Sequence, residues 1–269
     1  MFDGVLDEVR LASTTLSSTW ISTEYKNQLD PSTFFTVNSQ EVYSTTTYST
    51  GSTTQTFTYD WLGNLTSDSS LGSYAYLGNT GSLYANPHAA TSVGGAAQTY
   101  DNNGNKTATY ASSTALYTWN YRDNLTAAGN GVATSTYAYD HTGQRKEKTS
   151  AGITTTYPFS FYDTNGTTTA RHILLGDYLI GTLESVGATT TTYHNHTDHL
   201  NSAAVVTDST GALIQTLAYE PFGSPLIDEQ QTPFTESKQY IGQEYDGESQ
   251  LSYLNARYYE GGGGQFLSK

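Results

Sequence analysis

The sequence predicts an all-β protein, a curled antiparallel sheet built from short strand pairs, with one short helix near the N-terminus. Three observations support this fold class. The chain of 269 residues contains 23 tyrosines and 25 glycines and is rich in threonine and serine. Tyrosine and threonine favour pleated, half-buried strands, whereas glycine, asparagine and aspartate mark turns. A Tyr-Asp pattern also recurs at steps of 17 to 24 residues, and uninterrupted apolar runs are short.

The repeats are clearest in FTYDWLGNLTS (57–67), QTYDNNGNKTA (98–108), YTWNYRDNLTA (117–127) and YAYDHTGQRKE (137–147). Alternating aromatic residues place their rings on one strand face, an Asp or Asn begins a tight turn, and Gly accommodates positive φ. Asp123 replaces this glycine in the third unit, and Tyr76 and Tyr162 are weaker equivalents. Four units at similar spacing disfavour the alternative of unrelated hairpins with similar turns. The positions that define the pattern are Tyr59, Asp60, Gly63, Tyr100, Asp101, Gly104, Tyr139, Asp140 and Gly143.

The two ends of the chain differ from the repeats. Residues 2–12 resemble a strand, and four apolar or aromatic residues between positions 16 and 25 share one helical face before Pro31. From about Arg171 the segments become more apolar, and 202–219 predicts a hairpin that turns at 208–211. We therefore divide the chain into residues 1–37, 38–170 and 171–269.

Composition excludes several classes of function. With 25 acidic and 11 basic residues the net charge is −14, which disfavours a nucleic acid or an anionic membrane as partner. The absence of cysteine excludes disulfides, thiolate metal sites and a cysteine nucleophile. No apolar run is long enough for a membrane span. Met1-Phe2-Asp3 does not begin a signal peptide, so either the chain is not exported or its true N-terminus is missing.

The stretch HNHTDH at 194–199 raises the question of a metal site, because H-x-H-x-D-H is the spacing of binuclear metallo-hydrolases. Such a site needs further histidines downstream, and none follows His199. The upstream residues His88, His141 and His172 lie in repeat-like contexts and do not suggest a site. We predict no catalytic metal and no cofactor. The alternative is weak, adventitious metal binding by the three histidines of the stretch, His194, His196 and His199.

Other clusters of polar residues favour structure over chemistry. Glu244, Asp246 and Glu248 fit a solvated strand and turn better than a catalytic carboxylate pair. Arg257 lies among aromatic residues and is expected to stack on rings or to pair with a carboxylate in the core. The glycines at 261–264 are not followed by Lys-Ser/Thr or by a helix, so they do not form a phosphate loop. No catalytic residue is predicted, and the chain is not expected to be an enzyme.

Ordered motifs in the last hundred residues resemble a known family. HTDHL (196–200) followed by Asn201-Ser202 resembles HTDHLGS, and YEPFG (219–223), GQEYD (242–246), YLNARYY (253–259) and GQFLS (264–268) follow in family order. Together with the repeats they resemble the YD repeats and associated core of the Rhs family, which is shared with insecticidal toxin-complex proteins and teneurins. The similarity covers about residues 55–269. The matched signature positions are His196, Asp198, His199, Pro221, Phe222, Gly223, Arg257, Tyr258 and Tyr259.

The N-terminal 37 residues resemble the C-terminal end of a laminin-G-like, concanavalin-type sandwich, a fold that needs two sheets. Only one strand and one helix of such a fold are present, so we expect a remnant. In the Rhs family a self-cleaving aspartyl site lies just beyond the core, and no residue here can be assigned to it.

The resemblance implies a partial Rhs-type β-shell, since sheets of this family spiral into a hollow shell around a toxin polypeptide. The expected function is a non-enzymatic structural scaffold that encapsulates or presents a polymorphic toxin in a large secreted or cell-surface bacterial protein. Its partners would be the rest of its own polypeptide, including a C-terminal toxin cargo. The alternative is an adhesion or carbohydrate-binding module with cell-surface glycans as partners. With about six repeats, we expect an open sheet that does not enclose a cargo by itself.

Overall fold

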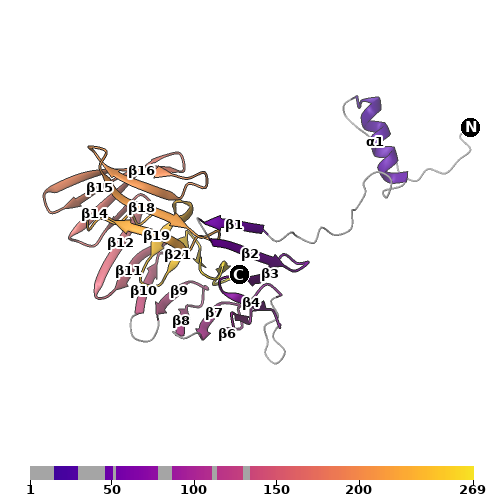
Figure 1. The fold of residues 1–269 in the computed structure, drawn as a ribbon, viewed down its shortest axis with the longest axis horizontal. Helices are drawn as coiled ribbons and strands as arrows, with labels where there is room; N and C mark the ends of the chain where they lie inside the picture. Colours follow the sequence, from indigo (N-terminus) through magenta and orange to yellow (C-terminus); the bar gives the residue numbers. More distant parts are fainter. Residues whose placement is uncertain (1–14, 30–45, 51–52, 78–86, 111–113, 130–133) are drawn as a thin grey trace, which may run out of the picture. The chain divides into compact units, whose positions relative to one another are not determined.

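Figure 1 shows the computed structural model, which describes residues 15–29, 46–50, 53–77, 87–110, 114–129 and 134–269. The chain divides into two units, Met1–Ser44 and Thr45–Lys269. The first contains the predicted helix, α1 (Ser18–Leu29), whose Trp20, Ile21 and Tyr25 side chains are exposed. Among the described helices none has the length and apolarity to cross a membrane. The strand expected at 2–12 and the boundary at residue 37 lie outside the described residues, so the N-terminal remnant stays a prediction.

The second unit is built on a 19-stranded antiparallel sheet, which confirms the predicted fold class. Each strand pairs with the next one along the chain, and within the described strands β1 and β19 each have one partner, so hydrogen bonding does not close the sheet. The strands are β1 (Thr46–Thr50), β2 (Thr53–Tyr59), β3 (Leu65–Asp68), β4 (Gly72–Ala75), β5 (Ser92–Val93), β6 (Ala96–Tyr100), β7 (Lys106–Tyr110), β8 (Thr114–Trp119), β9 (Leu125–Gly129), β10 (Thr134–Tyr139), β11 (Arg145–Ser150), β12 (Ile153–Phe159), β13 (Tyr162–Thr164), β14 (Thr168–Leu175), β15 (Tyr178–Val186), β16 (Thr189–Thr197), β17 (Ala203–Asp208), β18 (Leu213–Tyr219) and β19 (Pro225–Gln230). Strand β14 runs across position 170, where the sequence suggested a segment boundary.

A second, four-stranded sheet at the C-terminus lies inside the arc of the large sheet, as the yellow strands of Figure 1 show. It follows a short 3₁₀ turn, η1 (Tyr240–Gly242), and contains β20 (Glu244–Asp246), β21 (Leu251–Leu254), β22 (Arg257–Glu260) and β23 (Gln265–Phe266). One core cluster joins the two sheets: Tyr117, Leu125, Ala128 and Tyr137 of the large sheet pack with Leu251, Tyr253, Tyr258 and Leu267. The C-terminal sheet therefore covers the inner face of the large sheet here.

The alternating pattern of the repeats explains which residues enter this core. Along β10 the burial alternates strictly, with Ser135 and Tyr137 inward and Thr134, Thr136 and Ala138 outward. Successive side chains of a strand point to opposite faces, so the rings that recur at period two all reach the same inner face. The alternation of residues within each short repeat thus determines which side chains are buried.

The aromatic side chain at the position equivalent to Tyr59 also links neighbouring repeats. In three repeats the polar group of this side chain donates a hydrogen bond to a backbone carbonyl of the preceding repeat. The acceptor is in each case the first residue of that repeat's return strand. The bonds run from Tyr76 Oη to Leu65 at 2.9 Å, from Trp119 Nε1 to Lys106 at 2.7 Å and from Tyr139 Oη to Leu125 at 2.6 Å. A buried aromatic ring with a polar tip needs such a partner. Tyr76, the weaker equivalent in the sequence, makes the same contact as the clear repeats.

The repeat turns have the predicted geometry. Oδ1 of Asp60 accepts hydrogen bonds from the backbone N–H groups of Leu62 and Asn64, at 2.8 and 2.9 Å. Asp101 and Asp140 accept equivalent bonds two and four residues on. The fourth turn position is left-handed throughout: φ is +82° at Gly63, +91° at Gly104, +60° at Asp123 and +87° at Gly143. Local turn chemistry therefore determines the hairpins, as the sequence indicated.

Replacing Gly63 with valine is expected to lower the free energy of unfolding by about 1–3 kcal/mol, because a β-branched residue is strained at positive φ. Urea-induced unfolding would measure the loss. Gly262 is the control, since its φ lies outside the left-handed region and a Cβ there would meet nothing within 4 Å. Equal losses at the two positions would mean that the left-handed turn is not required.

Gly94 would not serve as that control. Its φ is +56°, and a Cβ would lie 2.2 Å from the backbone oxygen of Leu71. The sequence shows the Gly94-Gly95 pair but not this contact with a neighbouring turn.

Candidate functional site

The HNHTDH stretch forms the end of a strand and the turn that follows it. His194 and His196 are two residues apart on β16, so they share one face, and both are exposed. His199 is exposed in the turn after the strand. His196 Nε2 lies 3.3 Å from Thr207 Oγ1 on the neighbouring strand. The three imidazoles thus occupy solvent-facing positions that suit a surface role.

Asp198 has the same role here as the aspartates of the repeat turns. Its Oδ1 accepts hydrogen bonds from the backbone N–H groups of Leu200 and Ser202, each at 2.8 Å. Asn201, which stands where the family has glycine, has a φ of +68°. Asparagine tolerates this left-handed conformation better than most residues. The carboxylate of the metal-like motif is therefore used by the turn.

Replacing His194, His196 and His199 together with alanine is expected to change the free energy of unfolding by no more than about 0.5 kcal/mol, as for exposed residues without buried partners. Thermal unfolding with and without a chelator measures the effect. A large loss of stability, or a hydrolytic activity that disappears in His196→Ala, would show instead that the stretch is a functional metal site.

His172, which the sequence did not connect with any site, lies at the centre of a buried polar cluster. Its Nε2 is 2.9 Å from Asp163 Oδ2, and its Nδ1 is 3.1 Å from Thr182 Oγ1 and 3.5 Å from Glu236 Oε1. Burial favours neutral imidazole, but the hydrogen bond to Asp163 and the charges of Glu236 and Glu244 prevail and raise the pKa of His172. The sequence did not show this burial, which follows because β14 turns His172 into the interior.

Glu236 is fully buried, and three donors hold its carboxylate. These are Thr182 Oγ1 at 2.6 Å, Asn195 Nδ2 at 2.9 Å and the backbone N–H of Lys238 at 3.1 Å. Thr182 and Asn195 belong to β15 and β16, whereas Glu236 lies in the segment before η1. The carboxylate therefore connects the large sheet to the C-terminal segment.

The acidic residues around 244–248 are not the solvated cluster that the sequence suggested. Glu244 and Asp246 point inward from β20, and only Glu248 is exposed. Lys238 Nζ is 2.9 Å from Glu244 Oε1. Burial alone would raise the pKa of Glu244, but the charges of Lys238, His172 and Arg145 lower it to about 2. Residues two apart on a strand lie on the same face, so Glu244 and Asp246 are buried together. Two buried carboxylates need basic partners, and this is the signal that could have predicted Lys238 and Arg145.

Asp246 pairs with Arg145 in a second buried cluster. Arg145 Nη1 is 2.6 Å from Asp246 Oδ2, and both side chains are about 1% exposed. The Arg145 guanidinium lies 4.4 Å from the ring centre of Tyr157 and 4.7 Å from that of Tyr253. Within the part of the chain that the structure describes, its Nε and Nη2 have no hydrogen-bond partner. Lys148 Nζ also approaches Asp246, at 3.2 Å. The repeat residue Arg145 thus fixes the second sheet by charge as well as by ring contacts.

The remaining signature residues also make structural contacts. Arg257 stacks on Phe266 at 3.8 Å as expected, but it is exposed and not part of the core. The Pro221-Phe222-Gly223 turn packs on β2, where Phe222 meets Phe57 edge-on with ring centres 5.0 Å apart. Tyr259 Oη donates to the backbone oxygen of Phe222 at 2.9 Å. Near β2 and β18 the two ends of the large sheet therefore meet through side chains.

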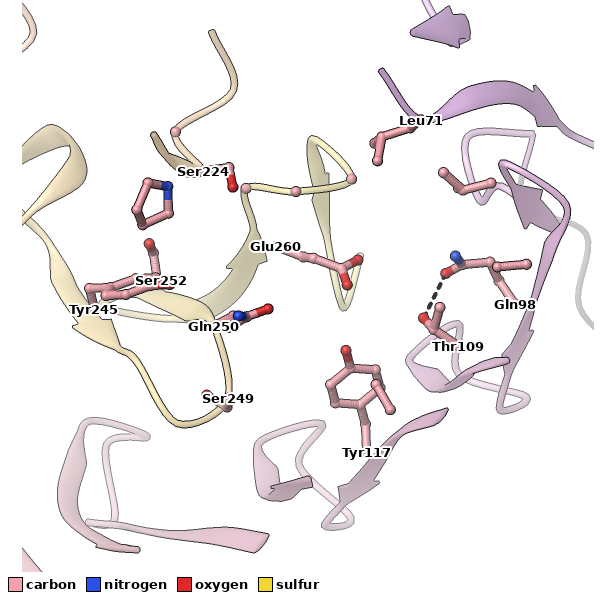
Figure 2. Close-up of a pocket in the computed structure, with 18 residues that line it drawn as sticks. Leu71, Gln98, Thr109, Tyr117, Ser224, Tyr245, Ser249, Gln250, Ser252 and Glu260 are labelled. Atoms are coloured by element: carbon pink, nitrogen blue, oxygen red, sulfur yellow. Dashed lines mark hydrogen bonds between the residues drawn. The ribbon is translucent and has the colours of Figure 1, made fainter. Parts of the chain in front are cut away.

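A cavity of about 430 Å³ lies between the large sheet and the C-terminal segment (Figure 2). Its lining is rich in hydroxyl and amide groups, and Thr109 donates to Gln98 at 3.2 Å. Among the lining residues Glu260 is the only carboxylate, and none is His, Cys, Asp, Lys or Arg. Glu260 pairs with the buried Lys106 at 2.7 Å. The cavity thus brings together neither a nucleophile with a histidine base nor two carboxylates.

Comparisons with known proteins agree with this architecture. Residues 170–269 match the family model described as Teneurin YD-shell. The chain is 33% identical over 190 residues to the tRNA(Glu)-specific nuclease WapA of Bacillus subtilis subsp. natto and to the tRNA3(Ser)-specific nuclease WapA of Bacillus spizizenii. Each match covers 66% of this chain but 8% of the relative. The nuclease names therefore describe proteins of which this chain spans a small part.

Solved structures show the same fold. The crystal structure of TcdB2-TccC3 superposes with a TM-score of 0.50 at 18% identity, over 80% of this chain and 14% of that chain. A second structure, TcdB2-TccC3-TEV, gives a TM-score of 0.50 at 17% identity over the same shares. The Tyr-Asp turns, the sheet that they build and the match of residues 170–269 to the Teneurin YD-shell model support assignment of the chain to the Rhs/YD-repeat family.

Proposed function

We propose that the chain is a non-enzymatic structural scaffold, part of an Rhs-type shell that encapsulates or presents a toxin in a large secreted or cell-surface bacterial protein. The observation that carries this proposal is the inward packing of the repeat rings. Tyr117 and Tyr137 of the large sheet are buried against Tyr253 and Tyr258 of the second sheet. The wall of a shell needs the aromatic rings of its repeats packed in this way, because this packing joins one repeat to the next.

The alternative, a carbohydrate-binding or adhesion module, requires exposed aromatic rings that line a groove. The most exposed aromatic residues of the described repeats are Trp61, at 76%, and Tyr121, at 90%. They lie in two different turns, and neither lines the cavity of Figure 2. These two rings therefore do not form a sugar-binding groove.

The ionisable groups also support a non-enzymatic role. The buried charges described above all have partners within the protein, as expected where charges link two sheets. The net charge of −14 opposes binding of a polyanion such as tRNA. On this proposal the nuclease activity in the names of the Bacillus relatives resides outside the part that this chain matches. The partners of the chain are then other segments of its own polypeptide, including a downstream toxin.

Incubation of the purified chain with total tRNA is expected to leave the tRNA intact, and binding to a glycan array is expected to stay at background. Gel electrophoresis and array fluorescence measure the two results. Cleavage of tRNA that is lost on mutation of a residue of this chain would contradict the scaffold. Saturable binding of one glycan class would favour the adhesion module.

Encapsulation needs a direct test in the longer polypeptide that carries this segment. If the segment is shell wall, Tyr258→Ala, which removes a ring between the two sheets, should make downstream segments sensitive to limited proteolysis under conditions in which the parent is resistant. Tyr178→Ala changes a ring that is 58% exposed and serves as the control. Equal protection in parent and Tyr258→Ala would argue against an enclosing role.

A further inference from the structure

Three side chains from three strands meet at one point between the two sheets. Asp163 comes from β13, His172 from β14 and Glu244 from β20. One ligand atom of each lies within 4.8 Å of the other two, and His172 Nε2 is already 2.9 Å from Asp163 Oδ2. Within the described residues, this is the one group of three or more His and acidic side chains that meets this distance. The histidines of the HNHTDH stretch are not part of it.

The donor types suit a transition-metal ion. One imidazole nitrogen and two carboxylate oxygens are common ligands of Zn²⁺, and a site of three protein ligands leaves a position for water or another ligand. Metal-binding histidines usually direct their other ring nitrogen to a carboxylate, which fixes the tautomer. Here His172 Nδ1 faces Glu236 Oε1 at 3.5 Å and Thr182 Oγ1 at 3.1 Å. A metal that binds Nε2 would displace the proton that Nε2 shares with Asp163, while these two partners hold the other proton on Nδ1.

The outer residues are as firmly held as the three ligands. Glu236 is fully buried, and its carboxylate accepts hydrogen bonds from Thr182, Asn195 and the backbone of Lys238. Such an outer layer is what orients metal-binding side chains in proteins.

The charges of the cluster also favour a bound cation. The cluster contains three carboxylates, those of Asp163, Glu236 and Glu244, against two groups that can carry positive charge, Lys238 and His172. Buried charges need compensation, and a divalent cation would supply it. Lys238 donates a hydrogen bond to Oε1 of Glu244. The other carboxylate oxygen of Glu244, Oε2, is therefore the atom to consider as a metal ligand.

We propose that Asp163, His172 and Glu244 bind one divalent transition-metal ion of the Zn²⁺ type, which fastens the C-terminal sheet to the large sheet. The site goes beyond the scaffold function and does not depend on it. It is also separate from the exposed HNHTDH stretch, whose spacing first suggested a metal.

The test uses the full chain with His194, His196 and His199 all replaced by alanine, so that exposed imidazoles do not contribute. Titration of this chelator-stripped variant with Zn²⁺ by calorimetry is expected to show one ion per chain, and Zn²⁺ is expected to raise its melting temperature, because a ligand of the native state stabilises it. In the same background Asp163→Asn should weaken Zn²⁺ binding by about 10- to 100-fold. Asp208→Asn, which changes a carboxylate used only by a turn, should leave affinity unchanged.

A second variant and a direct measurement cover the case in which Asp163→Asn does not fold. Glu236→Gln keeps a hydrogen-bonding group behind the imidazole and should weaken binding about tenfold or more through its outer position. In the unmutated chain, the ¹⁵N resonance of His172 Nε2 should shift on addition of Zn²⁺. Loss of all Zn²⁺ binding in the triple alanine variant, unchanged affinity in Asp163→Asn, or an unshifted His172 resonance would each overturn the proposal.

Discussion

Replacing Tyr258 with alanine is expected to lower the free energy of unfolding by about 3–5 kcal/mol, the cost of removing a large buried aromatic side chain. Tyr258 is 1% exposed, and its ring centre lies 5.0 Å from that of Tyr137 and 5.1 Å from that of Tyr253. It is thus packed between a strand of the large sheet and its own sheet. The cavity left behind would open the contact between the two sheets. Urea unfolding followed by tyrosine fluorescence measures the loss.

Two further variants separate ring packing from the hydroxyl group. Tyr258→Phe removes only the hydroxyl, whose contacts to Tyr139 Oη and Arg145 Nη1 are both 3.4 Å, so a loss of about 1 kcal/mol is expected. Tyr178→Ala, at an exposed ring, should cost less than Tyr258→Ala by several-fold. A similar loss at Tyr178 and Tyr258 would contradict the packing of the second sheet described here.

Features set by neighbouring residues could be predicted from the sequence. The repeat turns depend on an aspartate or asparagine, the backbone amides two and four residues on, and one left-handed position, all within five residues. Asp60 and Gly63 show this dependence, and Asn201 shows it at a position where the family has glycine. Period-two alternation likewise predicted that the rings of Tyr137 and Tyr139 face inward together.

Features that depend on residues far apart in the chain could not be predicted. Arg145 and Asp246 are separated by 101 positions, and Lys106 and Glu260 by 154. No local pattern shows that the second sheet lies inside the first, so Glu244 and Asp246 looked like solvated carboxylates. His172 was missed for the same reason, because its partners come from β13, β15 and the segment before η1. The metal-like spacing of HNHTDH, in contrast, is fully visible in the sequence, yet a turn uses its carboxylate.

The contrast between these clusters bears on how the repeats and the C-terminal segment form one unit. Repeats contact mainly their neighbours, so a meander of hairpins gains little long-range order by itself. The C-terminal segment supplies this long-range order because it contacts several repeats at once. The contacts are the rings around Tyr258 and the buried charges around Arg145 and Glu236. We therefore expect the C-terminal segment to be required for a stable large sheet, and the buried ion pair to be its most sensitive polar contact.

Arg145→Met is expected to lower the free energy of unfolding by about 3–5 kcal/mol, because it leaves the carboxylate of Asp246 buried without its closest partner. Lys148 Nζ remains 3.2 Å from Asp246, which favours the lower end of this range. Chemical denaturation of both single variants and of the double variant Arg145→Met/Asp246→Leu gives the coupling between the two residues. The double variant should recover much of the loss, since it removes the unpaired carboxylate together with the unpartnered Nε and Nη2 of Arg145.

Lys146→Met is the matched control for this pair. Lys146 neighbours Arg145 on β11, but its ion pair with Asp140 is 3.6 Å long and its side chain is 39% exposed. Solvent screens such a pair, so the expected loss is below about 1 kcal/mol. If Arg145→Met costs no more than Lys146→Met, or if the two single losses simply add in the double variant, then the buried pair does not join the two sheets, and ring packing around Tyr258 must do so alone.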